Sequence, residues 1–315
     1  MTIVSNDHLT LVPQMSFDSP TLEFDFPGLE IGIAEYEEGP TGCTVFYFPN
    51  GVRTAVDPRG GMIGMTDAND WCSAICFAGG SLMGLEATAG AGAEIFARNG
   101  HNLDRQPVMN GAIIYDYGRR DNRIYPDKAL GRAAVKSARP GIFPLGARGA
   151  GRSAGVGAVF GDKWHEPSGQ GGAFRQIDDV KIGVFTVVNA LGAVHDRGGQ
   201  VVRGNRNPAT GERVNNTPEL ERRLAEQAGV QPRPHNTTLT VVATNLKLST
   251  HWLTQLGRQV HSSMARAIQP FHSIYDGDVL FTVTTDEVES DLHITTLGLI
   301  ASELAWDAIL ASAPI

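Results

Sequence analysis

The sequence lacks the features of secreted, membrane-spanning and nucleic-acid-binding proteins. Only three of its 315 residues are cysteine, and none forms a Cys-x-x-Cys pair, so neither a disulfide framework nor a cysteine-based metal site is predicted. The net charge is −8 and no Lys/Arg cluster forms a basic stripe, which argues against a nucleic-acid partner. No apolar run is long enough for a membrane span, and the N-terminus has no signal-peptide pattern. We therefore expect a soluble, cytoplasmic protein.

Patterns that bind cofactors are also missing. The 37 glycines cluster in Gly79–Gly92 and Gly146–Gly157, but neither cluster ends in the Gly-Lys-Ser/Thr of a phosphate-binding loop. His261 and His272 are eleven residues apart with no third ligand at a suitable spacing, so we interpret them as structural. The sequence thus predicts neither a metal nor another cofactor. The cysteines are expected to pack in the core, and they are Cys43, Cys72 and Cys76.

What the sequence does contain is enough apolar residues, 42%, for a large core. Strands and helices are interspersed without the regular βαβ rhythm of a doubly wound sheet. This favours an α/β (α+β) fold in which helices cover two sheets, a four-layer α-β-β-α sandwich. We expect residues 1–22 to form a flexible N-terminal arm and residues 23–315 to form a single domain.

Local patterns predict the individual elements. Asn50-Gly51 is a hairpin signal, and Asp70–Phe96 has a helical pattern broken at Gly79–Gly80. Residues 205–235 are polar and predict an exposed loop with one short helix. The expected strands are 32–34, 43–49, 53–56, 112–116, 180–188, 237–244 and 279–285, with a hairpin within 194–202, and the expected helices are 127–138, 218–227, 250–268 and 294–312.

The junction of Asn236 and Thr237 joins this loop to the β-branched run Thr237–Thr244, which is typical of a buried strand. If the bond between the two residues were cleaved, Thr237 would hold a free α-amine beside its own hydroxyl. That would pair a nucleophile with a base in one residue. A loop that enters a strand beginning with Thr is the ordinary structural interpretation, and the junction taken alone favours it.

Four other polar residues each allow a structural and a chemical interpretation. Asp276 and Asp278 precede the expected strand 279–285, and alternation places both on the same face, where two carboxylates could orient an amine. Otherwise they form an acidic turn. Asn189 ends an apolar strand, where its NH₂ group is either a donor to an oxyanion or part of a turn. Tyr115 either donates a hydrogen bond to a ligand or packs in a strand.

Four sequence blocks resemble a known family. They closely resemble the nylon-oligomer hydrolases that cut 6-aminohexanoate oligomers internally, within the self-processing L-aminopeptidase/D-esterases and β-peptidyl aminopeptidases. The similarity extends from about Leu22 to the C-terminus. It implies an N-terminal-nucleophile hydrolase that cuts itself between Asn236 and Thr237 into chains 1–236 and 237–315. The blocks are YEEGPTG (36–42), RTAVDPRGG (53–61), YPDKALGR (125–132) and QVHSSMARAIQPFHSIYDGDVLFTVTTD (259–286).

The resemblance also assigns roles to particular residues. It implies that Thr237 is the nucleophile and that Asp276 and Asp278 are the acidic pair beside it. Asn189 matches an asparagine at a strand end, and Tyr115 matches a tyrosine at the substrate cleft. The family implies a small-molecule or polymer amide substrate, no cofactor, and a homotetramer of processed protomers built as a dimer of dimers.

One position departs from the family pattern. The ungapped comparison from Gly141 onward places Ala158 where the nylon hydrolases carry an active-site lysine. The nearest lysine is Lys163, five residues further on. Either the chain works without that lysine, Lys163 substitutes for it, or the residue was deliberately removed. The sequence leaves these alternatives open.

The leading hypothesis is therefore a self-processing amidohydrolase for linear amide oligomers such as nylon-6 fragments. A related alternative is an aminopeptidase or amidase for short or β-amino peptides. Two further alternatives are an acyltransferase of the ornithine-acetyltransferase type and a non-catalytic, Gly-rich binding protein whose Asn236–Thr237 bond stays intact.

Overall fold

Strand β3 (Thr41–Pro58) connects the two β-sheets of the fold. In the computed structural model, which describes residues 3–313, its first half pairs with β2 (Glu30–Tyr36) and β4 (Trp71–Ala78). Its second half pairs with β16 (Val279–Val288). One strand therefore belongs to both sheets.

The strand order of the first sheet is β10-β11-β14-β16-β3. Strands β10 (Gln170–Ile177), β11 (Val180–Asn189) and β14 (Thr237–Leu246) are antiparallel neighbours, whereas β14 and β16 are parallel. The second sheet contains β2, β4 and the first half of β3. It is extended by β5 (Met109–Ile113) beside β4 and by the short β6 (Arg139–Pro140) beside β2.

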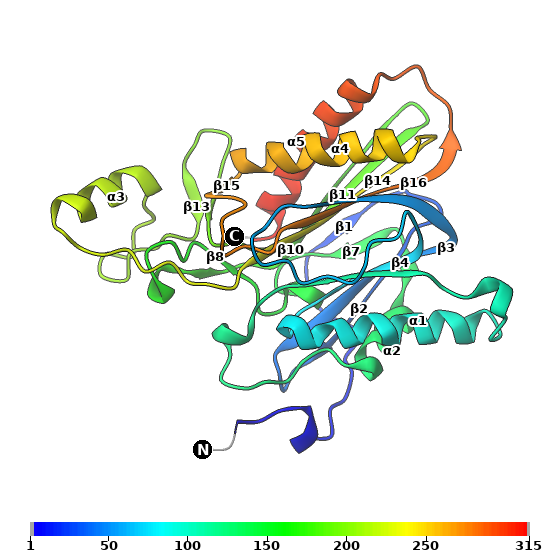
Figure 1. The fold of residues 1–315 in the computed structure, drawn as a ribbon, viewed down its shortest axis with the longest axis horizontal. Helices are drawn as coiled ribbons and strands as arrows, with labels where there is room; N and C mark the ends of the chain where they lie inside the picture. The colour runs from blue at the N-terminus through cyan, green and yellow to red at the C-terminus, as the bar shows by residue number, and fades with distance from the viewer. Residues whose placement is uncertain (1–2, 314–315) are drawn as a thin grey trace.

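Two pairs of helices cover the outer faces of the sheets (Figure 1). Helices α1 (Glu86–Arg98) and α2 (Lys128–Ser137) pack together on the sheet of β2 and β4. Helices α4 (Thr250–Ser263) and α5 (Ile294–Ala311) pack on the sheet of β10, β11 and β16. The layers follow the order α-β-β-α, which confirms the predicted sandwich.

Phenylalanine rings fill the space between the sheets. Phe185 of β11 is fully buried, and its ring centroid lies 5.2 Å from that of Phe24. The ring centroids of Phe46 and Phe143 lie 5.6 and 5.1 Å from it. Tilted and edge-on ring pairs contribute about 0.5–1.5 kcal/mol each beyond the burial of their area. The cluster therefore fixes how one sheet stacks on the other.

Most of the predicted helices are confirmed, and side chains cap the first turns of two of them. Asp127 Oδ1 accepts a hydrogen bond from Leu130 N (3.0 Å) at the start of α2, and Ser249 Oγ accepts one from Trp252 N (3.4 Å) at the start of α4. Helix α4 ends at Ser263, earlier than predicted. The other confirmed elements are α3 (Asn216–Ala225) and the hairpin of β12 (Ala193–His195) and β13 (Val201–Arg203).

The predicted hairpin at Asn50-Gly51 is wrong, because β3 continues through these residues. The pairing of β3 with β4 shifts register between Tyr47 and Val52, so the dipeptide forms a bulge. Gly51 has φ 69°, and a Cβ at this position would lie 1.9 Å from the Trp71 ring. The turn signal of Asn-Gly is real, but tertiary pairing uses it to bend one strand.

The helix predicted over Asp70–Phe96 is correct only in its second half. Residues 71–78 form β4, and α1 begins at Glu86. Strand β4 lies inside the sheet, so it is a continuous apolar run whose periodicity does not distinguish strand from helix. The cysteines are fully buried and unpaired, as predicted, and they are Cys43, Cys72 and Cys76.

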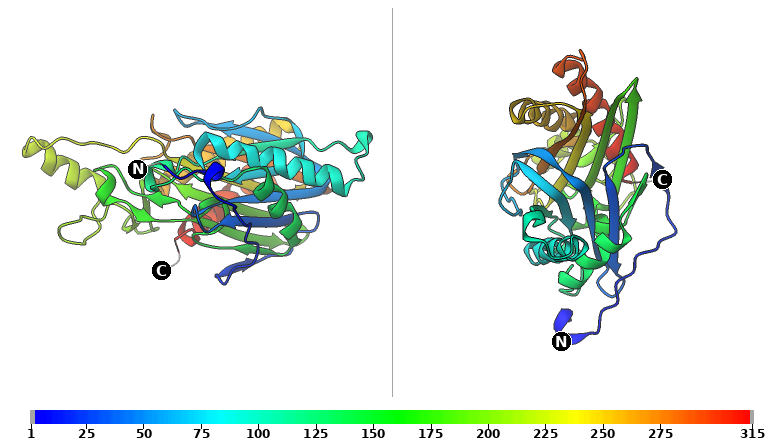
Figure 2. Two further views of the ribbon diagram at one scale, coloured as in Figure 1. Left: turned by 90° about the horizontal axis from the view of Figure 1, so that it is seen from below. Right: turned by 90° about the vertical axis from the view of Figure 1, so that its right-hand side faces the viewer.

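The predicted N-terminal arm follows the protein surface (Figure 2). Asn6 Nδ2 donates to Asp127 Oδ2 (3.2 Å), and Gln14 exchanges backbone hydrogen bonds with Glu35. Its flexibility stays a prediction, and residues 1–2 lie outside the described residues.

Short strands and 3₁₀ helices complete the fold. The short strands are β1 (Thr21–Glu23), β7 (Ile142–Pro144), β8 (Gly155–Val156), β9 (Glu166–Pro167) and β15 (Ile268–Gln269). The 3₁₀ helices are η1 (Asn6–His8), η2 (Ser81–Leu85), η3 (Leu103–Arg105), η4 (Tyr117–Arg119), η5 (Gly149–Gly151), η6 (Asp162–Trp164) and η7 (Met264–Arg266).

Helix α5 qualifies the expectation that no segment could span a membrane. Its 18 residues have a mean hydropathy of 1.4, enough in length and composition for a span. However, its apolar side chains pack against α4, β10 and β11 as part of a core cluster. A core helix of a globular domain meets the same two criteria.

We expect the ring cluster between the sheets to dominate stability. Phe185→Ala removes a fully buried ring and should lower the free energy of unfolding by about 3–5 kcal/mol. Phe174→Ala, at a half-buried ring on the neighbouring strand β10, should cost less than half as much. Urea unfolding followed by circular dichroism measures both, in a Thr237→Ala background that keeps the chain in one piece. Equal losses for the two variants would contradict the expectation.

Candidate active site

Thr237 is the first residue of β14 and is fully buried. Because β14 and β16 are parallel, both strands begin at the same edge of the sheet. The turn before β16, which contains Asp276 and Asp278, therefore lies beside Thr237 although about 40 residues separate them in sequence. On the other side, Asn189 at the end of β11 is the direct partner of Thr237. The fold thus brings together four of the predicted residues.

The Asn236–Thr237 peptide is held by hydrogen bonds on both sides. Thr237 Oγ donates to the carbonyl oxygen of Asn236 (2.5 Å), and the backbone N–H of Gly277 donates to the same oxygen (2.8 Å). The N–H of Asn236 donates to the carbonyl of Tyr275 (2.9 Å). The hydroxyl therefore lies against the carbonyl group of its own preceding residue, with a fixed donor on that oxygen.

Asp276 is buried, and three donors hold its carboxyl group. Leu191 N donates to Oδ1 (3.1 Å), and the backbone N–H (3.0 Å) and the hydroxyl of Ser273 both donate to Oδ2. Burial, and secondarily the charge of Asp278, raises the pKa of Asp276 to about 7 despite these hydrogen bonds. The carboxyl group thus takes up a proton near neutral pH.

Asp278 is also buried and connects the start of β14 to a histidine pair. Its Oδ1 accepts from Thr238 N (2.7 Å), and its Oδ2 accepts from His272 N (3.1 Å) and bonds to His272 Nδ1 (2.9 Å). The ring of His261 lies 4.4 Å from that of His272 and bonds to Asp57 Oδ2 (3.1 Å). The histidines predicted as structural therefore support one of the predicted site residues.

The loop after β3 holds the aspartate turn from the outside. Arg59 N donates to the carbonyl of Asp278 (2.9 Å) and Met62 N to that of Asp276 (2.8 Å). A Cβ at Gly60 would lie 2.2 Å from the carbonyl oxygen of Asp276. Only glycine allows this approach, which gives a physical reason for the glycine pair after Arg59.

Asn189 and Tyr115 are joined to each other as well as to the site. Asn189 Oδ1 accepts from Gly155 N (3.2 Å), and its NH₂ group donates to the carbonyl of Tyr115 (3.1 Å). One N–H of the Asn189 side chain thus donates to the backbone, and the second N–H can donate to a ligand. Burial raises the pKa of the Tyr115 phenol, which therefore stays a neutral donor at physiological pH.

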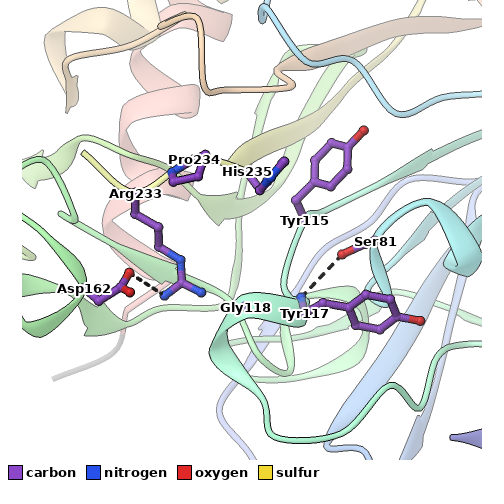
Figure 3. Close-up of a pocket in the computed structure, with 8 residues that line it drawn as sticks. All are labelled: Ser81, Tyr115, Tyr117, Gly118, Asp162, Arg233, Pro234 and His235. Carbon is purple, nitrogen blue, oxygen red and sulfur yellow. Dashed lines mark hydrogen bonds and ion pairs between the residues drawn. The ribbon is translucent and has the colours of Figure 1, made fainter. Parts of the chain in front are cut away.

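A pocket of about 430 Å³ lies next to the Asn236–Thr237 bond. In Figure 3 the rings of Tyr115 and His235 lie side by side along it, with centroids 5.6 Å apart. His235 has φ 69°, a left-handed conformation that is uncommon for non-glycine residues. The residues that line the pocket are Ser81, Tyr115, Tyr117, Gly118, Asp162, Arg233, Pro234 and His235. The segment before the bond therefore forms one wall of the pocket.

Ala158, which stands where the nylon hydrolases carry a lysine, and Lys163, the nearest lysine, lie in different environments. Ala158 is fully buried and belongs to the site region, because its N–H donates to the carbonyl of Leu191 (3.0 Å) and its carbonyl accepts from Arg233 N (3.3 Å). Lys163 is exposed in η6. In the part of the chain that the structure describes, no hydrogen bond or ion pair connects Lys163 to Thr237, Asn236 or the aspartates.

A cation that the sequence did not single out lies close to the bond. Arg119 Nη2 is 3.5 Å from Asn236 Oδ1 and donates to the carbonyl of Gly155 (3.0 Å). Arg233, three residues before the bond, pairs with Asp162 (3.2 Å). Neither arginine stands in a recognisable motif, so only the folded chain brings them to Asn236.

Comparisons with known proteins identify relatives of this chain. The chain is 45% identical to a 6-aminohexanoate-oligomer endohydrolase of Kocuria sp. (strain KY2), over 98% of this chain and 90% of that protein. It is 46% identical to a protein of the same description from Agromyces sp. (strain KY5R), over 97% and 89%.

Solved structures show the same fold at low identity. The L-aminopeptidase D-Ala-esterase/amidase from Ochrobactrum anthropi, described as a variant of the Ntn hydrolase fold, superposes with a TM-score of 0.67 at 16% identity, over 95% of this chain and 88% of that one. This confirms the N-terminal-nucleophile type of the four-layer sandwich. Residues 24–313 match peptidase family S58. With nearly its whole length matched, the chain belongs to peptidase family S58.

Proposed function

We propose that this protein is an amidohydrolase that cuts its own Asn236–Thr237 bond and then uses Thr237 to hydrolyse linear amide oligomers of the 6-aminohexanoate type. The observation that carries the proposal is the contact of Thr237 Oγ with the carbonyl group of Asn236, beside two buried aspartates. The relatives described as 6-aminohexanoate-oligomer endohydrolases support the substrate class. The mature protein would consist of chains 1–236 and 237–315.

Self-cleavage begins with attack of Thr237 Oγ on the carbonyl carbon of Asn236. The tetrahedral intermediate carries negative charge on the carbonyl oxygen, to which Gly277 N–H already donates (2.8 Å). One such donor stabilises the transition state by about 2.7–4 kcal/mol. The proton that Oγ loses on attack ends on the departing nitrogen, so breaking the C–N bond leaves an ester on Oγ and frees the α-amine. Water then hydrolyses the ester, giving a carboxylate on Asn236 and restoring the hydroxyl.

The new α-amine is the base of the mature site. Its ordinary pKa of about 7.7–8.0 leaves part of it neutral at pH 7 and able to accept the hydroxyl proton. Asp276 and Asp278 stand in the turn beside the start of β14 and would hold the ammonium form that results. The two carboxylates thus have the role of the acid that orients histidine in a serine triad.

Substrate hydrolysis repeats the same chemistry on an external amide. The substrate carbonyl takes the place of the Asn236 carbonyl, and the hydroxyl of Thr237 forms an acyl-enzyme that water releases. Gly277 N–H remains a donor to the oxyanion, and the second N–H of Asn189 adds another. Tyr115 lines the pocket beside this position and contacts the acyl chain. Neither a metal nor another cofactor enters these steps.

The pocket favours oligomer hydrolysis over aminopeptidase action. An aminopeptidase needs a carboxylate for the substrate ammonium group, and the one acid in the pocket lining, Asp162, is already paired with Arg233 (3.2 Å). The aromatic and apolar lining suits a polymethylene chain. We further propose that processed protomers act in the cytoplasm and assemble as a homotetramer, a dimer of dimers, as the family resemblance implies.

Thr237→Ala should abolish self-cleavage and amide hydrolysis together. Denaturing gels and intact mass should show fragments of 236 and 79 residues for the natural chain and one 315-residue chain for the variant. Thr238→Val is the matched control, because the neighbouring hydroxyl is buried without a hydrogen-bond partner among the described residues. This control should still be cut. Fragments of the same size from Thr237→Ala would overturn the mechanism.

The processed protein should cut a 6-aminohexanoate tetramer at internal bonds, even when both ends are blocked by acetyl and amide groups. Blocking removes the terminal ammonium group that an aminopeptidase binds, so cleavage of the blocked tetramer would show that the enzyme cuts internal bonds. Liquid chromatography with mass spectrometry identifies the products, with Thr237→Ala as the blank. Release of single residues only, and only from substrates with a free amine, would favour the aminopeptidase alternative instead.

The uncut chain should lose stability as pH rises through the range in which Asp276 ionises. Its pKa is raised to about 7 in the folded state and is about 3.9 in the unfolded state. Between these values the folded state holds a proton that the unfolded state has lost, so stability is greatest below pH 4 and falls until about pH 7. The loss is on the order of 4 kcal/mol.

Urea unfolding of Thr237→Ala between pH 4 and 8, with and without Asp276→Asn, measures this effect. The Asn variant should lack the decline, while Asp291→Asn, at an exposed acid, should keep it. A difference between Asp276→Asn and its parent that does not change with pH would show that Asp276 holds no extra proton.

A further inference from the structure

Arg119 is a half-buried residue with part of its guanidinium group removed from water. Its Nε and Nη1 atoms are buried and have no hydrogen-bond partner among the described residues. Its Nη2 donates to the neutral carbonyl of Gly155 (3.0 Å) and lies 3.5 Å from Asn236 Oδ1. Burial and the charge of Arg233 lower the pKa of Arg119 to about 9, which leaves it charged at neutral pH.

The acids near Arg119 are paired with other arginines. Asp116 Oδ1 bonds to Arg120 Nη2 (3.2 Å), and Asp162 Oδ1 pairs with Arg233 (3.2 Å). A buried cation without a counter-ion costs several kcal/mol of stability. Packing alone therefore does not account for an arginine at position 119.

The guanidinium group of Arg119 fits in its place because residue 155 is a glycine. A Cβ at Gly155 would lie 1.8 Å from Arg119 Nη1, so any other residue there would displace it. The same Gly155 donates its N–H to Asn189, the strand partner of Thr237. The position of Arg119 is thus tied to the site on one side and to the residue before the bond on the other.

We propose that Arg119 is a positioning residue for self-cleavage, which holds the side chain of Asn236 and places a positive charge on the acyl side of the bond to be cut. This role rests on the proposed function. Arg119 holds Asn236 Oδ1, while Asn236 Nδ2 donates to the carbonyl of Arg233 (2.7 Å). The two contacts orient the Asn236 carbonyl toward Thr237 Oγ. The guanidinium charge also favours the negative charge that develops there.

A positioning role and a structural role predict opposite effects on stability. Arg119→Met keeps the length of the side chain but removes its charge and donors. It should slow self-cleavage by about 10- to 100-fold, the range for losing a charged hydrogen-bond donor. In the uncut Thr237→Ala background it should leave the melting temperature unchanged or raise it, because a buried unpaired charge is lost. Arg119→Lys should restore part of the cleavage rate.

Pulse-labelled cell-free synthesis followed by gel analysis measures the half-time of cleavage, and thermal unfolding measures the second effect. Arg120→Met is the matched control, because it removes a neighbouring buried arginine but leaves Asp116 unpaired. It should lower the melting temperature by several degrees. Asn236→Leu should slow cleavage and reduce the effect of a further Arg119→Met substitution, since the contact between the two side chains is already lost and only the effect of the charge remains.

Three results would overturn the proposal. They are cleavage of Arg119→Met at the natural rate, a fall in its melting temperature as large as that of Arg120→Met, and cleavage of Asn236→Leu at the natural rate. Failure of the proposed function is a different result, because the natural chain itself would then stay uncut.

Discussion

The parallel pairing of β14 with β16 is the constraint on which the site depends. Parallel strands begin at the same edge of a sheet, so Thr237 and the turn before β16 meet although α4 separates them in sequence. The register places Gly277 beside Thr237 and Asp278 beside Thr238, which explains the hydrogen bond from Thr238 N to Asp278. A slip of one residue would turn both carboxylates to the opposite face. The register is fixed in turn by burial on both faces of the sheet.

Burial gives the polar groups at this edge their unusual properties. Asp276 is almost completely removed from water and lies near a second carboxylate, so its charged form is destabilised and its pKa rises to about 7. Asp278 is equally buried but accepts hydrogen bonds from Thr238 and bonds to His272 through both backbone and side chain. Two acids in one turn are thus placed in different environments. A buried acid with a raised pKa, such as Asp276, is typical of acid–base sites.

The sequence predicted the elements whose signals are local. The helical patterns of 127–138 and 250–268 and the β-branched run after Thr237 predicted two helices and the central strand. The family resemblance supplied the four-residue constellation. The hairpin predicted at Asn50-Gly51 was wrong, because a local turn signal does not reveal that Trp71 packs over Gly51 within a longer strand. The sequence also missed Arg119, His272 as a partner of Asp278, and strand β10, because each depends on contacts between distant segments.

Cleavage of the Asn236–Thr237 bond would turn a neutral peptide into a buried carboxylate and a buried ammonium group, each costly without a partner. On the Thr237 side the fold already holds Asp276 and Asp278, and on the Asn236 side it holds the unpaired guanidinium of Arg119. Before cleavage Asp278 bonds to His272 and Asp276 holds a proton up to about pH 7, whereas Arg119 forms no ion pair among the described residues. Afterwards each new chain end would lie beside a charge of opposite sign. If the bond is cut as proposed, the two aspartates and the guanidinium group of Arg119 would therefore stabilise the charges of the new chain ends.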